Sequence, residues 1–227
     1  MSIDVWTRYE DAFSRNLYSG AAGETDPSFL RMEGSLPVLA SAPHAVNHYR
    51  EDRLKVADLY TGTLAMALHA STGCHAIVSS RTTVDPNWAI GGPYKEEVGR
   101  IVRERGIRYV LDLHGSSDAR PFDVDLGTMR GVSMSRAAVS RIRELFLEAG
   151  FERVEIDHSF PATHPGTVTS YAHRELGVQS IQIEIARAYR DPERPERFLR
   201  TVRALEQAVA YLNASARDNL DPEVERP

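Results

Sequence analysis

The sequence predicts an α/β protein, a three-layer α/β/α sandwich around a mixed, mostly parallel sheet. Short apolar runs alternate with segments whose apolar residues recur at helical spacing along most of the 227 residues. This alternation is typical of a parallel sheet that is covered by helices. No internal repeat or low-complexity linker interrupts the pattern. Residues 1–227 are therefore expected to form a single catalytic domain, with an N-terminal extension at 1–34 and a flexible tail at 214–227.

The expected elements follow from periodicity and from the residues that end them. Strands are expected at 36–42, 76–78, 107–114, 122–128, 154–156 and 178–185, and the alternation at 122–128 predicts a half-exposed strand. Helices are expected at 53–70, 93–105, 134–149, 168–176 and 193–213. Pro93 suits a first helical turn and Gly106 suits a helix end. Trp6 begins a helically spaced apolar series in the extension, which is interpreted as a lid or packing segment.

Composition and charge are typical of a soluble globular protein, and the candidate site described below leads us to expect a small-molecule substrate. The formal net charge is -5 and the pI is about 5.9, which argues against a general nucleic-acid or anionic-membrane binder. The single cysteine, Cys74, cannot form an internal disulfide and is expected to be a small core residue. The N-terminus has no secretory pattern, and no stretch of about 20 apolar residues occurs, so a cytoplasmic location is expected. The oligomeric state stays open.

Polar residues collect where the apolar runs end. Asp112 and His114 close the run that starts at Tyr109, and a buried strand has no use for either residue without partners. His44 follows the strand at 36–42, and Glu184 lies near the end of the strand at 178–185. The carboxyl ends of parallel strands meet at one edge of a sheet. These side chains are therefore expected to share a cleft.

Two histidines and an acid are the ligands expected of a catalytic zinc ion, which lowers the pKa of its bound water toward about 7. Glu184 is then the candidate general base, and Asp112 is a candidate partner for the second ring nitrogen of a liganding histidine. Of the loop histidines, His164 is the best candidate to line the cleft. Structural alternatives remain, because His44 can be a turn residue and Glu184 can face solvent on an edge strand.

Five motifs in order resemble the N-formylglutamate amidohydrolase family over residues 36–190. They are Ser-Ala-Pro-His-Ala at 41–45, Ala-Asp-Leu-Tyr at 57–60, Arg-Thr-Thr-Val-Asp-Pro-Asn at 81–87, Leu-Asp-Leu-His at 111–114 and Ile-Gln-Ile-Glu-Ile at 181–185. The family is similar in fold to the zinc carboxypeptidases and the aspartoacylase-type deacylases. The resemblance implies a phosphorylase/hydrolase-like domain, one zinc ion and hydrolysis of an amide bond.

By position, the resemblance implies that His44 and His114 hold the metal and that Glu184 is the general base. Asp58, placed on the expected helix at 53–70, matches the acidic ligand, and Glu51 and Asp52 are its competitors.

The resemblance also implies that Arg81 and Asn87 bind a substrate carboxylate, a task that suits the two-pronged guanidinium of arginine. The sequence departs from the family at two positions. Asn47 stands where the carboxypeptidase pattern has an acid, and Trp88 stands where the family has an arginine. Arg120 and Arg187 are the candidates to supply the missing cation.

Three functions fit these residues. The first is a zinc-dependent amidohydrolase that acts on a small, carboxylate-bearing N-acyl amino acid. The second is a metallopeptidase that cleaves γ-glutamyl or cell-wall-type peptides, for which a long open groove is expected in place of a closed pocket. The third is a non-catalytic binding protein of the same fold. A serine hydrolase is disfavoured, because the sequence has no Gly-Xaa-Ser-Xaa-Gly motif.

Overall fold

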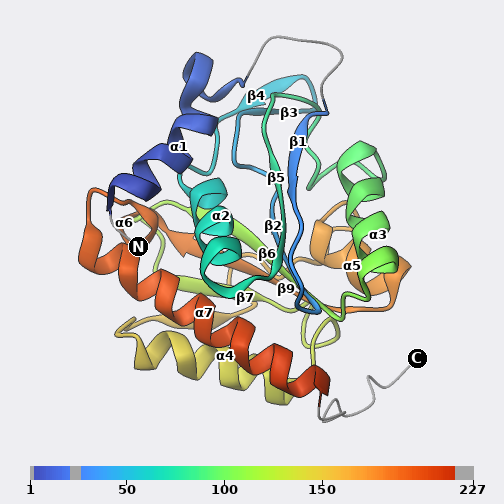
Figure 1. Ribbon diagram of the computed structural model, residues 1–227, viewed down its shortest axis with the longest axis vertical. Coiled ribbons are helices and arrows are strands. Elements are labelled where there is room, and N and C mark those ends of the chain that lie inside the picture. Colours follow the sequence, from blue (N-terminus) through green and yellow to red (C-terminus); the bar gives the residue numbers. More distant parts are fainter. Residues whose placement is uncertain (1–2, 21–26, 218–227) are drawn as a thin grey trace.

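A seven-stranded mixed sheet organises the computed structural model, which describes residues 3–20 and 27–217 (Figure 1). The strand order is β1-β5-β2-β6-β9-β7-β8. Strands β5, β2, β6 and β9 run parallel, β1 and β7 are antiparallel to their inner neighbours, and β8 is parallel to β7. The strands are β1 (Phe29–Met32), β2 (Val38–Ala42), β5 (His75–Ser79), β6 (Tyr109–Ser116), β7 (Val124–Gly127), β8 (Val154–Ile156) and β9 (Gln179–Ala186).

Helices cover both faces of the sheet, so the predicted α/β sandwich is confirmed (Figure 1). One face packs on α1 (Ile3–Tyr18), α2 (Thr61–Thr72), α4 (Arg136–Glu148) and α7 (Pro195–Arg217), with the short α6 (Arg187–Arg190) at the end of β9. The other face packs on α3 (Pro93–Arg105) and α5 (Val168–Leu176). No described helix is both long enough and apolar enough to cross a membrane.

The two-residue period of the strands separates core residues from site residues. In β6, Leu111 and Leu113 face the larger helical layer, whereas Asp112 and His114 alternate with them and face the other side. In β9, Ile183 belongs to the same core and Glu184 follows it on the opposite side. The polar residues of these inner strands lie on the same face as α3 and α5, past the end of the smaller apolar cluster that these helices form. A cavity opens at that place.

Three expectations about the elements are wrong. The segment 53–70 is not one helix: it begins with the hairpin of β3 (His48–Arg50) and β4 (Arg53–Lys55), and α2 starts only at Thr61. Asp58 therefore lies in a loop between β4 and α2. Its N–H donates to the carbonyl of His44 (2.9 Å), and its own carbonyl accepts from Thr61. The strand at 122–128 is not half-exposed, because β7 is fully buried between β9 and β8.

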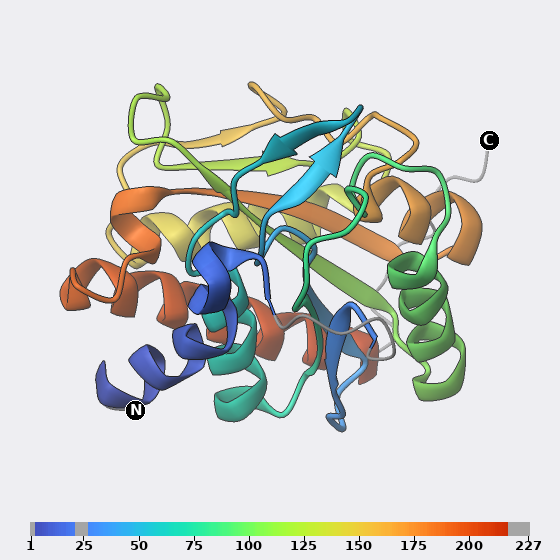
Figure 2. The same cartoon turned by 90° about the horizontal axis from the view of Figure 1, so that it is seen from above.

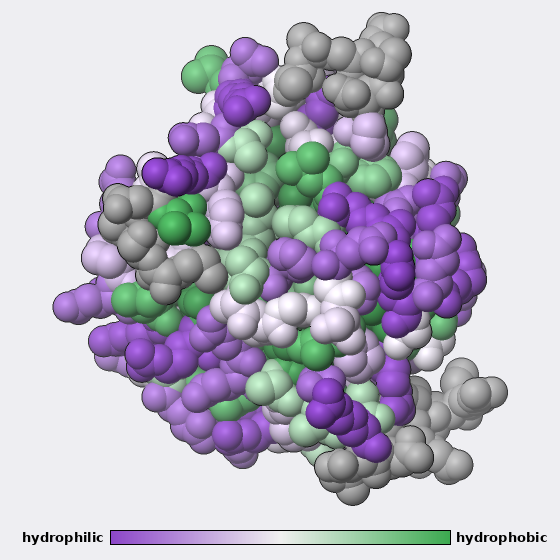
Figure 3. Space-filling model, in the orientation of Figure 1, coloured by the Kyte–Doolittle hydropathy of each residue, from purple (hydrophilic) through white to green (hydrophobic). Residues whose placement is uncertain are grey.

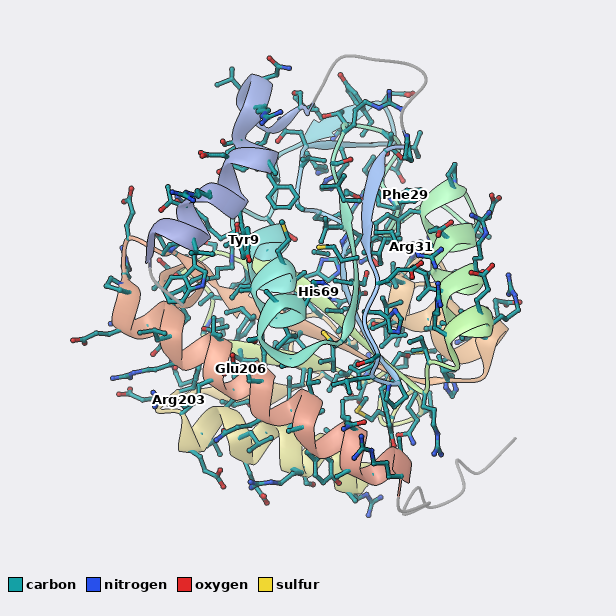
Figure 4. All side chains as sticks on the ribbon, viewed as in Figure 1. Tyr9, Phe29, Arg31, His69, Arg203 and Glu206 are labelled. Carbon is teal, nitrogen blue, oxygen red and sulfur yellow. The ribbon has the colours of Figure 1, made fainter. Side chains whose placement is uncertain are left out.

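The N-terminal segment is more than a lid or packing extension. Its helix packs Trp6 and Phe13 into the core, but residues 29–32 form the edge strand β1 of the main sheet. Arg31 on β1 points toward α3 (Figure 4) and pairs with Glu97 at 2.8 Å. Hydrophilic residues gather over α3 on this face of the molecule (Figure 3). At the other end, α7 extends through 214–217 of the expected tail, and 218–227 lie outside the described residues.

Candidate active site

A cavity of about 430 Å³ lies beside the carboxyl ends of β2, β6 and β9. Its floor holds His44, Asp58, His114 and Glu184. The β3–β4 hairpin and the loop at 80–92 lie side by side on one flank (Figure 2), and Tyr49 forms a bridge with Val84 between them. Residues 159–164 supply the facing wall. The predicted convergence of the strand-end residues thus occurs in one cavity.

Three side chains at the floor form a compact group of metal-ligating atoms. Asp58 Oδ2 lies 3.2 Å from His44 Nδ1 and 3.4 Å from His114 Nδ1. Four-coordinate zinc with bonds of about 2.0–2.2 Å holds neighbouring ligand atoms roughly 3.3–3.5 Å apart. The spacing and the two-nitrogen, one-oxygen donor set therefore fit a catalytic zinc site with three protein ligands. Glu51 and Asp52 instead form the exposed turn of the hairpin and lie outside this group.

The outer nitrogens of both histidines face other carboxylates. His44 Nε2 lies 2.7 Å from Asp85 Oδ1, and His114 Nε2 lies 3.4 Å from Asp112 Oδ2. Asp112 is fully buried, and Ser41 also donates to it at 3.2 Å. The hydrogen bond to Asp85 keeps a proton on His44 Nε2 and leaves its Nδ1 lone pair available to a metal ion, and the nearby charge of Asp112 favours the same tautomer of His114. Both histidines thus present Nδ1 toward Asp58.

A second group of potential ligands, His44, His48 and Asp85, is a poorer metal site. The Oδ2 atom of Asp85 lies 2.7 Å from the Arg50 guanidinium and 3.5 Å from His48 Nε2, and its Oδ1 also accepts the N–H of Asn87 (2.8 Å). These donors already occupy both carboxylate oxygens, and the arginine charge opposes a cation there. We therefore assign Asp85 to the support of His44.

Arg190 fixes the loop that carries Asp58. This buried guanidinium donates to the carbonyl of Leu59, next to Asp58, and to those of Ile185 (3.1 Å) and Ser116 (3.2 Å). A Cβ atom at Gly115 would lie 2.3 Å from Arg190 Cζ. Gly115 does line the cavity, but its missing side chain makes room for Arg190.

Charge pairing dominates the electrostatics of the group formed by His44, Asp58 and His114. Burial alone would lower the pKa of His44, but hydrogen bonds to Asp58 and Asp85 more than offset it, and the net pKa is raised. The same balance, with Asp112 and Asp58 as partners, raises the pKa of His114 well above its usual value. Burial alone would raise the pKa of Asp58, but the two histidines lower it. The group thus favours charged imidazoles next to carboxylates when no metal is bound.

Glu184 is the remaining acid at the floor. It is the register partner of His114 on the adjacent parallel strand, so the two side chains lie on the same side of the sheet. Gln182 donates to its Oε1 at 2.9 Å. Burial raises its pKa to about 7, even though nearby His114 lowers it. A carboxylate with a pKa near neutrality is suited to accept and return a proton.

The facing wall of the cavity is held by one carboxylate. Asp125, fully buried in β7, accepts the backbone N–H groups of His158 (3.0 Å), Ser159 (2.7 Å) and Phe160 (2.9 Å). Ser159 and Phe160 both line the cavity. Asp125 thus couples the sheet to the wall.

Replacing Asp125 with alanine is expected to destabilise the fold by about 2–4 kcal/mol, because three backbone amides lose their buried acceptor. KM should rise more than kcat falls, since the wall moves and the metal ligands stay. Urea unfolding and steady-state kinetics measure the two effects. The matched control is Asp123→Ala, since Asp123 accepts the N–H groups of Glu152 and Arg153 away from the cavity. An unchanged KM in Asp125→Ala alongside the loss of stability would contradict this role.

The four residues expected to bind substrate separate into two pairs. Asn87 and His164 line the cavity, whereas Arg81 and Arg120 are not among its lining residues. Arg81 forms a backbone bridge with Gly20, and Arg120 is exposed with its guanidinium 5.1 Å from the Phe160 ring. Arg187, the other candidate cation, lies over Tyr60 and also outside the lining.

Several contributing residues carried no clear sequence signal. Asp85 lies in an Asp-Pro-Asn turn, where an aspartate is common even when no functional site is present. Arg190 is a charged residue in a helical, charge-rich segment and reads as a surface residue. Only its burial and its carbonyl partners show its role.

No family model matches the sequence, and no curated protein matches it either. Solved structures do match. The N-formylglutamate amidohydrolase from Ralstonia eutropha JMP134 superposes with a TM-score of 0.62 at 17% identity, covering 85% of this chain and 99% of that chain. The chain has the fold of an N-formylglutamate amidohydrolase. The expected resemblance is therefore confirmed at the level of the fold.

Two further structures share this amidohydrolase fold. A bacteriophage poly-gamma-glutamate hydrolase matches with a TM-score of 0.52 at 15% identity, covering 85% of this chain and 93% of that chain. The gene product Atu2144 from Agrobacterium tumefaciens matches with a TM-score of 0.57 at 14% identity, covering 82% and 96%. The fold thus spans nearly the whole length of these proteins.

Proposed function

We propose that this protein is a zinc-dependent hydrolase that cleaves the amide bond of a small, carboxylate-bearing N-acyl amino acid. The observation that carries the proposal is the triangle of His44 Nδ1, Asp58 Oδ2 and His114 Nδ1 beside the buried carboxyl of Glu184. The solved amidohydrolase of the same fold supports the reaction class. The cavity volume is typical of small-ligand sites and favours an amino acid derivative over an extended peptide.

In this proposal the chain's own residues divide the work. His44, Asp58 and His114 hold the ion, which when bound supplies Lewis-acid polarisation of the scissile carbonyl. Asp85 and Asp112 keep the protons of the two histidines on Nε2. Glu184 accepts a proton from the attacking water at its carboxylate and delivers it to the departing amine nitrogen. Burial of Glu184 places its pKa near the value that allows both transfers.

The decisive test combines metal analysis with a substrate panel. The purified protein, reconstituted with zinc, is expected to bind about one equivalent and to release the amine from N-formyl, N-acetyl or N-benzoyl amino acids. A γ-glutamyl peptide in the same panel tests the peptidase alternative. Substoichiometric metal after reconstitution of folded protein, or a zinc-loaded protein inactive on every N-acyl amino acid, would reject the proposal.

Zinc binding is expected to release protons at pH 7. The raised pKa values of His44 and His114 leave these imidazoles largely charged without metal, whereas liganding requires the neutral form, so about one to two protons should leave. Calorimetric titrations in Pipes and Hepes, whose ionisation enthalpies differ and which bind zinc only weakly, measure the number. Identical binding enthalpies in the two buffers would contradict the prediction.

The same shifts give the sign of the pH effect on stability. A raised histidine pKa stabilises the metal-free fold fully below the ordinary value of 6.5, and this stability is lost as the pH rises through the folded-state pKa. The Tm of the metal-free protein should therefore fall above pH 6.5 more steeply than that of the zinc-loaded protein.

A further inference from the structure

We propose that Lys55, presented by the β3–β4 hairpin, binds the carboxylate of the substrate, and that the ring of His164, which is stacked on Trp88, packs against a planar acyl group. The substrate class is then N-aroyl or similar flat N-acyl amino acids. This inference rests on the proposed function and deepens it, because the family's arginine position is occupied by Trp88 and neither Arg81 nor Arg120 reaches the cavity.

The hairpin turns one face toward the cavity. His48 pairs with Lys55 and Tyr49 pairs with Leu54 in antiparallel register, so alternate residues lie on opposite faces. His48, Arg50 and Lys55 line the cavity. Tyr49 and Leu54, on the other face, are 46% and 53% exposed and do not line it. The inner face of the hairpin therefore brings two cations to the site.

Of these two cations, only Lys55 is available to a ligand. The Arg50 guanidinium is held by Asp85 at 2.7 Å and lies 4.8 Å from the centre of the Trp88 ring. Lys55 is exposed, and within 3–20 and 27–217 its ammonium has no hydrogen-bond or ion-pair partner. A single unpaired ammonium above a floor of metal ligands is suited to the carboxylate of an amino acid.

A flat aromatic surface lines the same cavity. The rings of Trp88 and His164 stack with centroids 3.9 Å apart and planes 6° from parallel. The chain at 164–167 is pressed against Trp88, since a Cβ atom at Gly166 would lie 1.9 Å from the Trp88 carbonyl oxygen. The stack is thus formed before any ligand arrives. Because His164 and the Arg50 guanidinium both lie over the Trp88 ring, the His164 ring is the flat surface left to a ligand, and it favours planar groups. A formyl group is too small to use it.

The test compares three probes: N-benzoylglycine, N-benzoylglycinamide and N-formylglycine. Lys55→Gln is expected to raise KM for N-benzoylglycine about tenfold, with kcat within about twofold, and to leave the neutral N-benzoylglycinamide unaffected. Release of benzoate follows the reaction with both benzoyl probes. His164→Ala is expected to lower the preference for benzoyl over formyl about tenfold.

The matched control is Arg53→Gln, which removes a cation from the same hairpin at a position that does not line the cavity. Equal KM changes in Lys55→Gln and Arg53→Gln, or no change in Lys55→Gln, would overturn the inference. So would wild-type protein that prefers N-formylglycine to N-benzoylglycine.

Calorimetric binding of N-benzoylglycine to the zinc-loaded protein separates this inference from the proposed hydrolysis. Binding that Lys55→Gln weakens and Arg53→Gln does not, without any benzoate release, would sustain the Lys55 site and reject hydrolysis of this substrate. Absence of both binding and benzoate release would reject the Lys55 site.

Discussion

Replacing Glu184 with glutamine is expected to lower kcat by about a thousandfold, within the range lost with a general acid–base group. Glutamine has nearly the same shape and keeps an oxygen for the Gln182 amide, but it cannot accept a proton. Zinc content and KM should stay close to those of the wild type, because Glu184 lies outside the ligand triangle. Steady-state kinetics and metal analysis of the same preparation measure both quantities.

The control for this substitution is Gln179→Ala in the same strand, which removes a side chain that does not line the cavity. It should keep kcat within about threefold, because the Gln179 side chain accepts the N–H of Ser135 at the start of the strand and does not reach the cavity. A Glu184→Gln protein with at least a tenth of the wild-type kcat would remove Glu184 from the reaction and leave the metal site intact.

Replacing His114 with alanine is expected to abolish both stoichiometric zinc binding and hydrolysis. Loss of a supporting partner alone costs about 10–100-fold in metal affinity, so the loss of a ligand should exceed that range. The variant should also be less stable by roughly 3–5 kcal/mol, because Asp58 and Asp112 lose a buried cationic partner. Zinc titration, kinetics and urea unfolding test the three effects separately.

His114→Gln keeps a polar group at this position and separates loss of the ligand from loss of folding. The matched histidine control is His173→Ala on α5, which is half-buried and remote from the cavity lining. It should bind one equivalent of zinc. If folded His114→Gln protein bound zinc with the wild-type affinity, the ligand assignment would be wrong and the alternative group with His48 and Asp85 would regain weight.

Much of the fold was predictable because its strands and helices carry strong local patterns. The strand at 107–114 corresponds to β6, and the helices at 93–105 and 168–176 correspond to α3 and α5. The apolar spacing at 53–70 resembles that of one helix, but the segment contains β4 and most of α2, with a loop between them. In the fold, tertiary hydrogen bonds to Asp58 and the pairing of β3 with β4 prevail over that local preference. β1 likewise forms because β5 offers it an edge.

The candidate site was predictable only in part. Asp112, His114 and Glu184 could be identified because a polar residue near the end of a buried strand is costly unless it has partners. Asp85 and Arg190 could not, since a turn aspartate and a helical arginine are ordinary residues in isolation. Their importance comes from contacts with His44 and with the carbonyl of Leu59, which lie far away in sequence.

By itself, the sequence determined the α/β class, which polar residues lie near the ends of the inner strands and which types of atoms are available to a metal ion. Periodicity and burial cost are local properties, so they can be recognised without coordinates. The tertiary structure alone decided which nitrogens face Asp58 and which cation reaches the cavity. Those features depend on strand register and loop path, and a one-residue shift in register turns each side chain to the opposite face.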